Sequence, residues 1–406
     1  MLVALILRLV VVALAWRSII DPDNHFGNFA AEMGWVARSL VTGHGFSSPF
    51  FPTTGPTALV PPLFPFLLAG VFRVFGLYSA HSAIAILALD SLFSTLTCIP
   101  VYLALRHTAG LRPARLGAWL WALYPFAINY ASSEVWDYAL TSLLFAICFY
   151  LALRLGQRHT LWAWFAFGLL YGLTALSNPS VLSLFPFLLL PALWSIPRSP
   201  HSRLAGIAIA ILGLLLVLTP WNIRNHRVFH QNIPVRNGFW LEFYAGNHGD
   251  SWTSNPPNTH PATSAAEMDR FVALGEMRYI ADKEQIAKSF VRSHPVWFLT
   301  ACLRRFIRFW TGVWSLSPAY IRYQPLDVPN LFFCTAVTLL MLRGLARWLR
   351  HNAAHALPFL ITILLFPIPY YLTHASMDYR QPIEPIILML ATIGIIGFAE
   401  KYPTAN

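Results

Sequence analysis

Charged residues are scarce in this chain of 406 residues: Asp, Glu, Lys and Arg together make up 11% of it, and only three of them are lysines. A soluble domain carries about a quarter charged residues, so the composition excludes an ordinary globule covered by water. Hydrophobic residues make up 56% of the chain and recur in long runs along its whole length. We therefore predict an all-α polytopic membrane protein.

Metal-binding and disulfide patterns are also missing. The cysteines are scattered without CxxC spacing and are interpreted as small apolar residues of the bundle: Cys98, Cys148, Cys302 and Cys334. The loop histidines, among them His260, show no HExxH spacing and are interpreted as solvated polar residues. We therefore expect no metal and no cofactor.

The net charge of +11 does not indicate a nucleic-acid partner, because the arginines form no single basic stripe. They lie mainly in short connections between apolar runs, where the cytoplasmic loops of membrane proteins collect positive charge. The partners expected from composition are membrane lipids. High Arg, Ala and Pro with low Lys indicate a GC-rich bacterial genome, which predicts a multi-pass protein of the bacterial inner membrane.

The apolar runs predict a bundle of about 10–12 helices, since a spanning helix needs about 20 mostly apolar residues. Candidates lie at 2–17, 58–77, 79–105, 115–131, 134–155, 160–177, 179–196, 204–220, 330–347, 356–373 and 381–399. The chain then divides into a transmembrane module at 1–220 with an outer loop at 18–57, an extracytoplasmic segment at 221–295, and interfacial and transmembrane helices at 296–406.

Arginine placement predicts the orientation of the bundle. The Arg-rich connections 106–115 and 343–351 should be cytoplasmic, which places 18–57 and 221–295 together on the opposite side. Two apolar stretches lie between the outer loop and the first cytoplasmic connection, where an odd number of crossings is needed, so one of them is expected not to span. The run 296–318 carries three arginines among apolar residues and is predicted to be an interfacial amphipathic helix.

The first outer loop contains a predicted helix that lies against the membrane surface and ends at Gly43 and Gly45. Its apolar face consists of residues at helical spacing: Phe29, Met33, Val36, Ala37 and Leu40. Glu32 would lie off this face.

Short motifs follow one another along nearly the whole chain. They are GxGFSSPF at 43–50, TGPTAxxPPxFP at 54–65, FxxFG at 72–76, LTPWxxRN at 218–225, GN at 246–247, GExxY at 275–279 and YRxPIEP at 379–385. In this order the sequence resembles the GT-C glycosyltransferases of glycosyltransferase family 39. That family includes protein O-mannosyltransferases and the aminoarabinose transferases that act on lipid A.

The resemblance implies a GT-C helix bundle, a polyprenyl-phosphate-linked sugar as donor, and a lipid, glycan or protein acceptor outside the cytoplasm. Family members place a carboxylate in the first outer loop as general base for an inverting transfer, and the match here is Glu32. Asp21 and Asp23 lie upstream as alternatives. Asp137 is expected to line the same cavity, or else only to complement the dipole of the helix that follows it.

The leaving phosphate needs cations, and Arg suits phosphate because its planar fork can hold two oxygens. Arg380, Arg224 and Arg227 are the candidates for donor-phosphate binding. Arg224 and Arg227 could instead anchor a helix at the headgroups, and Asp378 could pair with Arg380 as a structural ion pair.

Other classes of function fit the hydropathy. A lipid-linked sugar flippase or transporter usually shows inverted repeats, and this sequence contains no such duplication. A polysaccharide polymerase would share the outer segment but would lack the acidic helix of the first outer loop. A relative without catalytic activity remains a further alternative.

The predicted sidedness can be tested by cysteine labelling from outside the cell. A single cysteine placed near Ser251 should be labelled by a membrane-impermeant maleimide, whereas one near Gly110 should react only after the cells are permeabilised. The reverse pattern would contradict both the orientation and an extracytoplasmic donor site.

Overall fold

The computed structural model describes residues 1–21, 28–50, 53–155, 160–190, 200–249, 259–312, 317–323 and 327–398. Regular structure in these ranges is helical, apart from one isolated bridge between Ser47 and Pro56. The all-α prediction is confirmed.

The helices of the first half are α1 (Leu2–Ile19), η1 (Asn28–Ala30), α2 (Glu32–Val41), α3 (Leu63–Phe75), α4 (Ala80–Leu96), α5 (Cys98–Thr108), α6 (Leu111–Ala122), α7 (Pro125–Ser132), α8 (Tyr138–Leu155), α9 (Leu161–Ser177), η2 (Pro179–Leu184) and α10 (Phe185–Leu188). Those of the second half are α12 (Pro200–Phe229), α13 (Phe239–Gly246), α14 (Ala265–Leu274), α15 (Glu276–Ser293), α16 (Pro295–Thr311), α17 (Pro318–Tyr323), α18 (Asp327–His351), α19 (Ala353–Leu365), α20 (Ile368–Leu372), η3 (Asp378–Ile383) and α21 (Glu384–Ile396).

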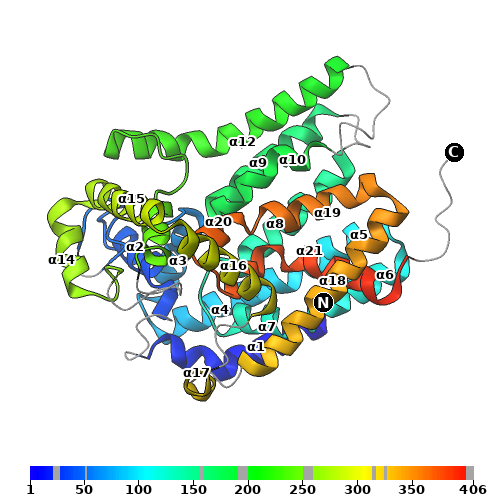
Figure 1. Cartoon of the computed structure of the whole chain (residues 1–406), viewed down its shortest axis with the longest axis horizontal. Coiled ribbons are helices and arrows are strands. Elements are labelled where there is room, and N and C mark those ends of the chain that lie inside the picture. The colour runs from blue at the N-terminus through cyan, green and yellow to red at the C-terminus, as the bar shows by residue number, and fades with distance from the viewer. Residues whose placement is uncertain are drawn as a thin grey trace.

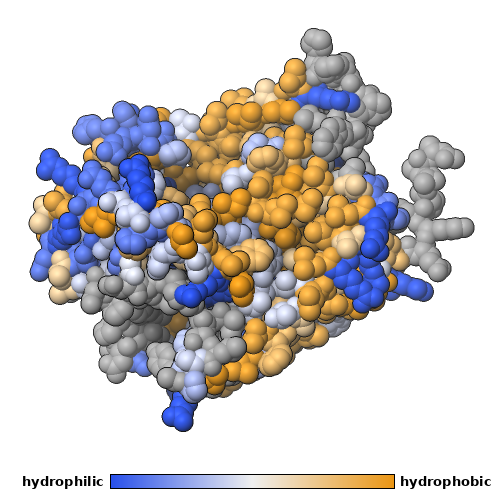
Figure 2. Space-filling view, viewed as in Figure 1, coloured by the Kyte–Doolittle hydropathy of each residue, from blue (hydrophilic) through white to orange (hydrophobic). Residues whose placement is uncertain are grey.

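Six helical stretches in the described ranges are long and apolar enough to cross a membrane. They are Leu2–Ile19, Ala80–Thr108, Tyr138–Leu155, Arg203–Phe229, Val328–His351 and His355–Leu372. Figure 2 shows apolar side chains over the middle of the molecule, with polar side chains gathered at its two ends. In Figure 1, α14 and α15 lie at one of these ends and α5 and α6 at the other. The chain is a multi-pass membrane protein.

Several predicted spanning helices are shorter than expected. The stretch 58–77 forms only α3, whose 13 residues reach about 20 Å. This length is too short for a spanning helix, and it is compatible with the prediction that one apolar stretch before the first cytoplasmic connection does not span. The stretch 179–196 begins as η2 and α10, and 191–196 lies outside the described residues. The last stretch forms α21, also 13 residues long, and its side chains are buried from Glu384 to Gly394.

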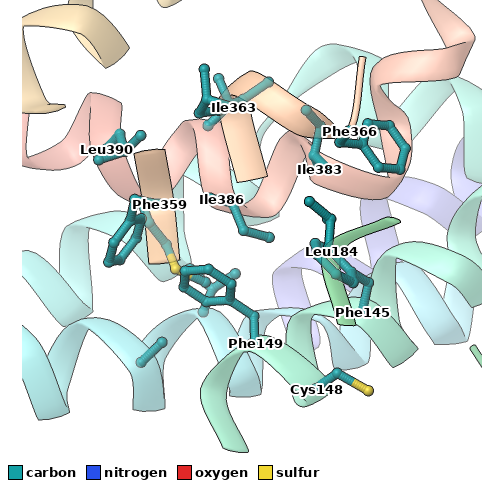
Figure 3. Packing of buried hydrophobic residues seen from close by; sticks show 14 of the residues in the cluster. Phe145, Cys148, Phe149, Leu184, Phe359, Ile363, Phe366, Ile383, Ile386 and Leu390 are labelled. Atoms are coloured by element: carbon teal, nitrogen blue, oxygen red, sulfur yellow. The ribbon is translucent and has the colours of Figure 1, made fainter. Parts of the chain in front are cut away.

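The short α21 is the centre of the larger core, where lipid does not reach it. Figure 3 shows Ile386 and Leu390 of α21 among the rings of Phe149 and Phe359. These two rings pack edge to face with centroids 4.8 Å apart. Because α21 is enclosed by other helices, protein takes the place of lipid around it, and it needs neither the length nor the outer polar caps of a spanning helix.

Glycines bring two helix pairs into close backbone contact. Gly344 of α18 and Gly394 of α21 lie against the carbonyls of Leu390 and Leu340, where a Cβ would overlap them. The pair α9 and α12 is joined in the same way at Gly168. Small residues serve this purpose in membrane bundles because helix association there depends on close packing.

Two outer helices differ from the expectation. The apolar face of α2 packs onto α3, where Phe29 and Phe72 meet edge to face, so it is covered by protein and not by the membrane surface. In α16 the amphipathic pattern is confirmed, but Arg305 and Arg308 point into the protein, whereas Leu299 and Leu303 are exposed.

Arg8 lies in the apolar helix α1 and is completely buried. Its guanidinium donates to the Ser94 hydroxyl at 3.0 Å and to the carbonyls of Trp121 and Ala122 at 3.4 and 3.0 Å. Both carbonyls belong to the end of α6. The Trp121 carbonyl also accepts the Tyr124 N–H at 3.3 Å, whereas the Ala122 carbonyl has Arg8 as its donor.

We expect Arg8→Met to lower the apparent melting temperature in detergent, because it removes the donor to the buried Ala122 carbonyl, at a cost of about 1–3 kcal/mol. The measurement is thermal unfolding of the full chain. Arg17→Met, at an exposed position of the same helix, is the matched control. An equal loss of stability in both variants would contradict the capping role of Arg8.

Candidate active site

Segments that lie far apart in the sequence meet at the end of the molecule that carries α14 and α15. Asn237 donates its backbone N–H to the Ala58 carbonyl at 3.0 Å. Glu276, the first residue of α15, accepts the Ala58 N–H at 2.8 Å and the Asn237 amide at 3.1 Å. The first outer loop and the 221–295 segment therefore form one body, as their predicted location on the same side requires.

Arg236 is the charged centre of this region. Its guanidinium donates to Glu242 Oε1 at 3.1 Å, and both side chains are about one third exposed (28% and 33%). Glu242 Oε2 bonds to Nε2 of His374 at 2.8 Å. Burial raises the pKa of Glu242, but His374 and Arg236 outweigh it and bring that pKa to about 2. Glu242 is thus an ionised carboxylate held between two cation-forming side chains.

Glu32 stands at the start of α2, with its side chain 19% exposed. The three residues before it, Phe29, Ala30 and Ala31, all have positive φ, a strained conformation that clusters at functional sites. Burial raises the pKa of Glu32 above its ordinary value, while His260 and Arg236 oppose the shift. Glu32 is therefore a more basic carboxylate than an exposed glutamate.

His260 is buried, which corrects its interpretation as a solvated loop histidine. Its Nδ1 accepts the N–H of Ala262 at 3.2 Å, so the ring proton is on Nε2. That nitrogen faces Glu32 Oε1 at 4.0 Å. The ring also packs edge to face on Phe50 of the first outer loop.

Asp137 immediately precedes α8 and is buried. Its Oδ2 accepts the Thr141 hydroxyl at 2.9 Å, and Thr141 shares a further hydrogen bond of 2.7 Å with Ser177. Burial raises the pKa of Asp137 to about 6 even though Thr141 and the charge of Arg236 lower it. Arg236 therefore influences both predicted catalytic carboxylates, Glu32 and Asp137.

The three arginines predicted to bind phosphate have different surroundings. Arg380 is completely buried, pairs through Nε with Glu384 at 2.7 Å and donates to the Phe309 and Trp310 carbonyls. The expected competitor Asp378 instead accepts the Tyr138 hydroxyl at 2.5 Å. Partners hold most of the Arg380 guanidinium, although its second terminal nitrogen has no hydrogen-bond partner among the described residues.

Arg224 and Arg227 lie together at the end of α12. Arg224 donates to the Phe46 and Thr57 carbonyls at 2.7 Å each, so it joins α12 to the first outer loop, whereas Arg227 is exposed. Of the upstream acids, Asp21 is exposed beyond the end of α1, and Asp23 lies outside the described residues.

Sequence reasoning missed Arg236, Glu242 and His374. Arg236 stands in IPVRNG, a stretch with no helical pattern, and only its contact with Glu242 distinguishes it. The GN motif at 246–247 was the available signal, because it follows Glu242 by one helical turn and marks a close approach of two chain segments.

Part of the chain matches a known protein family. Residues 59–223 match the family model described as dolichyl-phosphate-mannose-protein mannosyltransferase. The resemblance to glycosyltransferase family 39 is confirmed. The matched region contains Asp137, begins after Glu32 and ends before Arg236. No curated protein matches the sequence.

Solved structures show a similar fold. The apo oligosaccharyltransferase of Archaeoglobus fulgidus aligns with 96% of this chain and 50% of its own, at 14% identity and a TM-score of 0.51. The same enzyme tethered with an acceptor peptide aligns with 97% and 49% of the two chains, at 13% identity and a TM-score of 0.50. ArnT from Cupriavidus metallidurans bound to undecaprenyl phosphate aligns with 97% and 77%, at 12% identity and a TM-score of 0.36.

These likenesses concern the fold. The chain has a GT-C-like fold, and it spans about half the length of the archaeal enzymes.

The raised pKa of Glu32 predicts the acid limb of the pH–activity profile. A general base acts only when ionised, so activity should fall, as the pH is lowered, at a higher pH than an ordinary glutamate would give. His260→Gln removes a group that lowers this pKa and should move the limb to still higher pH. His44→Gln, at an exposed histidine, is the control, and an equal shift there would contradict the assignment.

Proposed function

We propose that this protein is a membrane glycosyltransferase that moves a sugar from a polyprenyl-phosphate donor to an acceptor on the extracytoplasmic face, with inversion at the anomeric carbon. One observation carries the proposal: burial raises the pKa of two carboxylates, Glu32 and Asp137, and the positive charge of Arg236 acts on both of them. The family model, described as a dolichyl-phosphate-mannose mannosyltransferase, supports a lipid-phosphate donor.

The carboxylates of the site divide into two kinds. Glu242 has a pKa of about 2 and both of its oxygens are bonded, so it is a poor proton acceptor. Glu32 and Asp137 have raised pKa values, which suits a general base working near neutral pH. Separated pKa values of this kind distinguish acid–base groups from positioning groups.

In the proposed reaction Glu32 takes the proton from the acceptor nucleophile. The electron pair of that nucleophile forms the new bond to the anomeric carbon, and the bond from this carbon to the phosphate oxygen breaks on the opposite face. The phosphate leaves with the bonding electrons and gains negative charge. Asp137 is the alternative base, since it too is near Arg236.

Arg236 is the cation we assign to the leaving phosphate. Its guanidinium is partly exposed, and Glu242 orients it, whereas the guanidinium of Arg380 is engaged by Glu384 inside the bundle. A preorganised cation aimed at developing charge commonly supplies the largest part of catalysis.

Phosphate binding by the other three arginines is the alternative. Arg224 would have to break its hydrogen bonds to the Thr57 and Phe46 carbonyls, and Arg380 is completely buried. Arg227 is exposed, and no contact with a described residue orients it.

Glu32→Gln should lower the rate of sugar transfer by about 10²–10⁴-fold, because the amide keeps the size of the side chain but cannot accept the proton. Binding of undecaprenyl phosphate should remain nearly unchanged. The measurements are turnover with a lipid-linked sugar extract and lipid binding by the purified full chain. Glu284→Gln, at a glutamate that pairs with Lys288 on α15, is the matched control.

Near-normal turnover of Glu32→Gln combined with an inactive Asp137→Asn would transfer the role of base to Asp137. Normal turnover in both variants would reject carboxylate-based transfer at this site.

A further inference from the structure

His374 is a buried residue that bonds to Glu242 of the candidate site, and the proposed reaction gives it no role. It follows α20, and its side chain is 5% exposed. The carboxylate of Glu242 can only accept hydrogen bonds, so the Nε2 of His374 must carry the proton in their 2.8 Å contact. The other ring nitrogen, Nδ1, is buried without a hydrogen-bond partner among the described residues. The imidazole therefore has one bond through which it can act, the bond to Glu242.

The chain of contacts runs from a buried side chain, His374, to two partly exposed ones. The histidine side chain is 5% exposed, Glu242 is 33% exposed and Arg236 is 28% exposed. Glu242 uses one oxygen for each neighbour, Oε2 for His374 and Oε1 for Arg236. The buried histidine thus fixes the inner oxygen of Glu242, and the outer oxygen fixes the guanidinium that faces the site.

A buried clamp brings Glu242 and His374 together. Arg305 of α16 donates to Asn247 Oδ1 at 3.1 Å, to the Leu372 carbonyl at 3.2 Å and to the Gly246 carbonyl. Asn247 donates to the Leu372 carbonyl at 2.8 Å. These bonds join the end of α13, which carries Glu242, to the end of α20, which His374 follows.

Gly246 permits this junction. A Cβ at Gly246 would overlap the carbonyl of Thr373, the residue before His374. Because the clamp by itself holds the two helix ends, the His374–Glu242 bond is not needed to join them. Its remaining effect is on the direction of Glu242 and, through Glu242, of Arg236.

We propose that His374 is a positioning residue for the phosphate of the donor: its Nε2–H holds Glu242, and Glu242 holds the guanidinium of Arg236 toward that phosphate. This inference rests on the role given to Arg236 in the proposed function. The chemical class recognised is a polyprenyl monophosphate, and the property controlled is recognition of its phosphate, not of its isoprenoid chain.

The test compares two lipids on the purified full chain in detergent: undecaprenyl phosphate and undecaprenol, which lacks the phosphate. His374→Leu removes the donor to Glu242 and should weaken binding of undecaprenyl phosphate by about tenfold, as the loss of a coupled charged contact does. Binding of undecaprenol should be unchanged. His374→Gln keeps an N–H that can reach Glu242 and should restore most of the affinity.

The second measurement is the affinity of the double variant His374→Leu/Arg236→Ala for undecaprenyl phosphate. If His374 acts through Arg236, His374→Leu should have no further effect on undecaprenyl phosphate binding when Arg236→Ala is already present. Asn247→Ala, in the clamp, is the control for a purely structural effect. It should lower the melting temperature and weaken the binding of both lipids to the same extent. If His374→Leu does not fold, Glu242→Gln replaces it, because the amide keeps an acceptor for His374 but loses the charge that holds Arg236.

The outcomes separate this inference from the proposed function. If Arg236→Ala leaves the affinity for undecaprenyl phosphate unchanged, the phosphate role of Arg236 is wrong and the inference falls with it. If Arg236→Ala weakens binding but His374→Leu does not, only the inference is overturned. Equal losses for both lipids in His374→Leu, or additive losses in the double variant, would also overturn it.

Discussion

Hydrogen bonds from arginines to backbone carbonyls at helix ends are the interaction on which this structure depends. Arg8 caps α6, Arg347 caps α21, and Arg380 donates to the last turn of α16. In an apolar bundle surrounded by lipid, a helix that ends inside leaves carbonyls that water cannot satisfy. Arginine meets this need because five N–H donors on one fork can serve several carbonyls at once, which lysine cannot do, and lysine is nearly absent from the chain.

The candidate site is a consequence of one such cap. Arg305 serves the ends of α13 and α20 together, and these are the helix ends beside Glu242 and His374. Arg236 differs from the capping arginines because it donates to a carboxylate, that of Glu242, and because its side chain is partly exposed. A cation in this situation retains donors for a ligand, whereas a cap has already used them. The same residue type therefore has two roles, and its partners distinguish them.

Hydropathy and motif order were enough to predict the helical class, the membrane location, the family and the presence of Glu32 in a helix of the first outer loop. Apolar length alone could not show that α21 is enclosed by protein, so its 13 residues appeared as a spanning helix. Nearness in sequence made Asp378 the expected competing partner of Arg380, yet Glu384, one helical turn away, holds that guanidinium. Arg236, Glu242 and His374 were missed because hydrogen bonds across as many as 132 positions bring them together, and no local pattern records such contacts.

The electrostatics of the site follow from how each carboxylate is surrounded. Glu242 loses water but gains His374 and Arg236, and its pKa falls to about 2. Glu32 loses water and has only a 4.0 Å contact with His260 as its nearest ion-pair partner in the described ranges, so burial dominates and its pKa rises. Arg236 thus stabilises the negative charge of Glu242 and also lowers, to a smaller extent, the pKa of Glu32. Because a phosphate bound at Arg236 would bring further negative charge near Glu32, donor binding itself should raise the basicity of Glu32. The base would then be strongest when the donor is in place, which links proton removal from the acceptor to occupancy of the phosphate site.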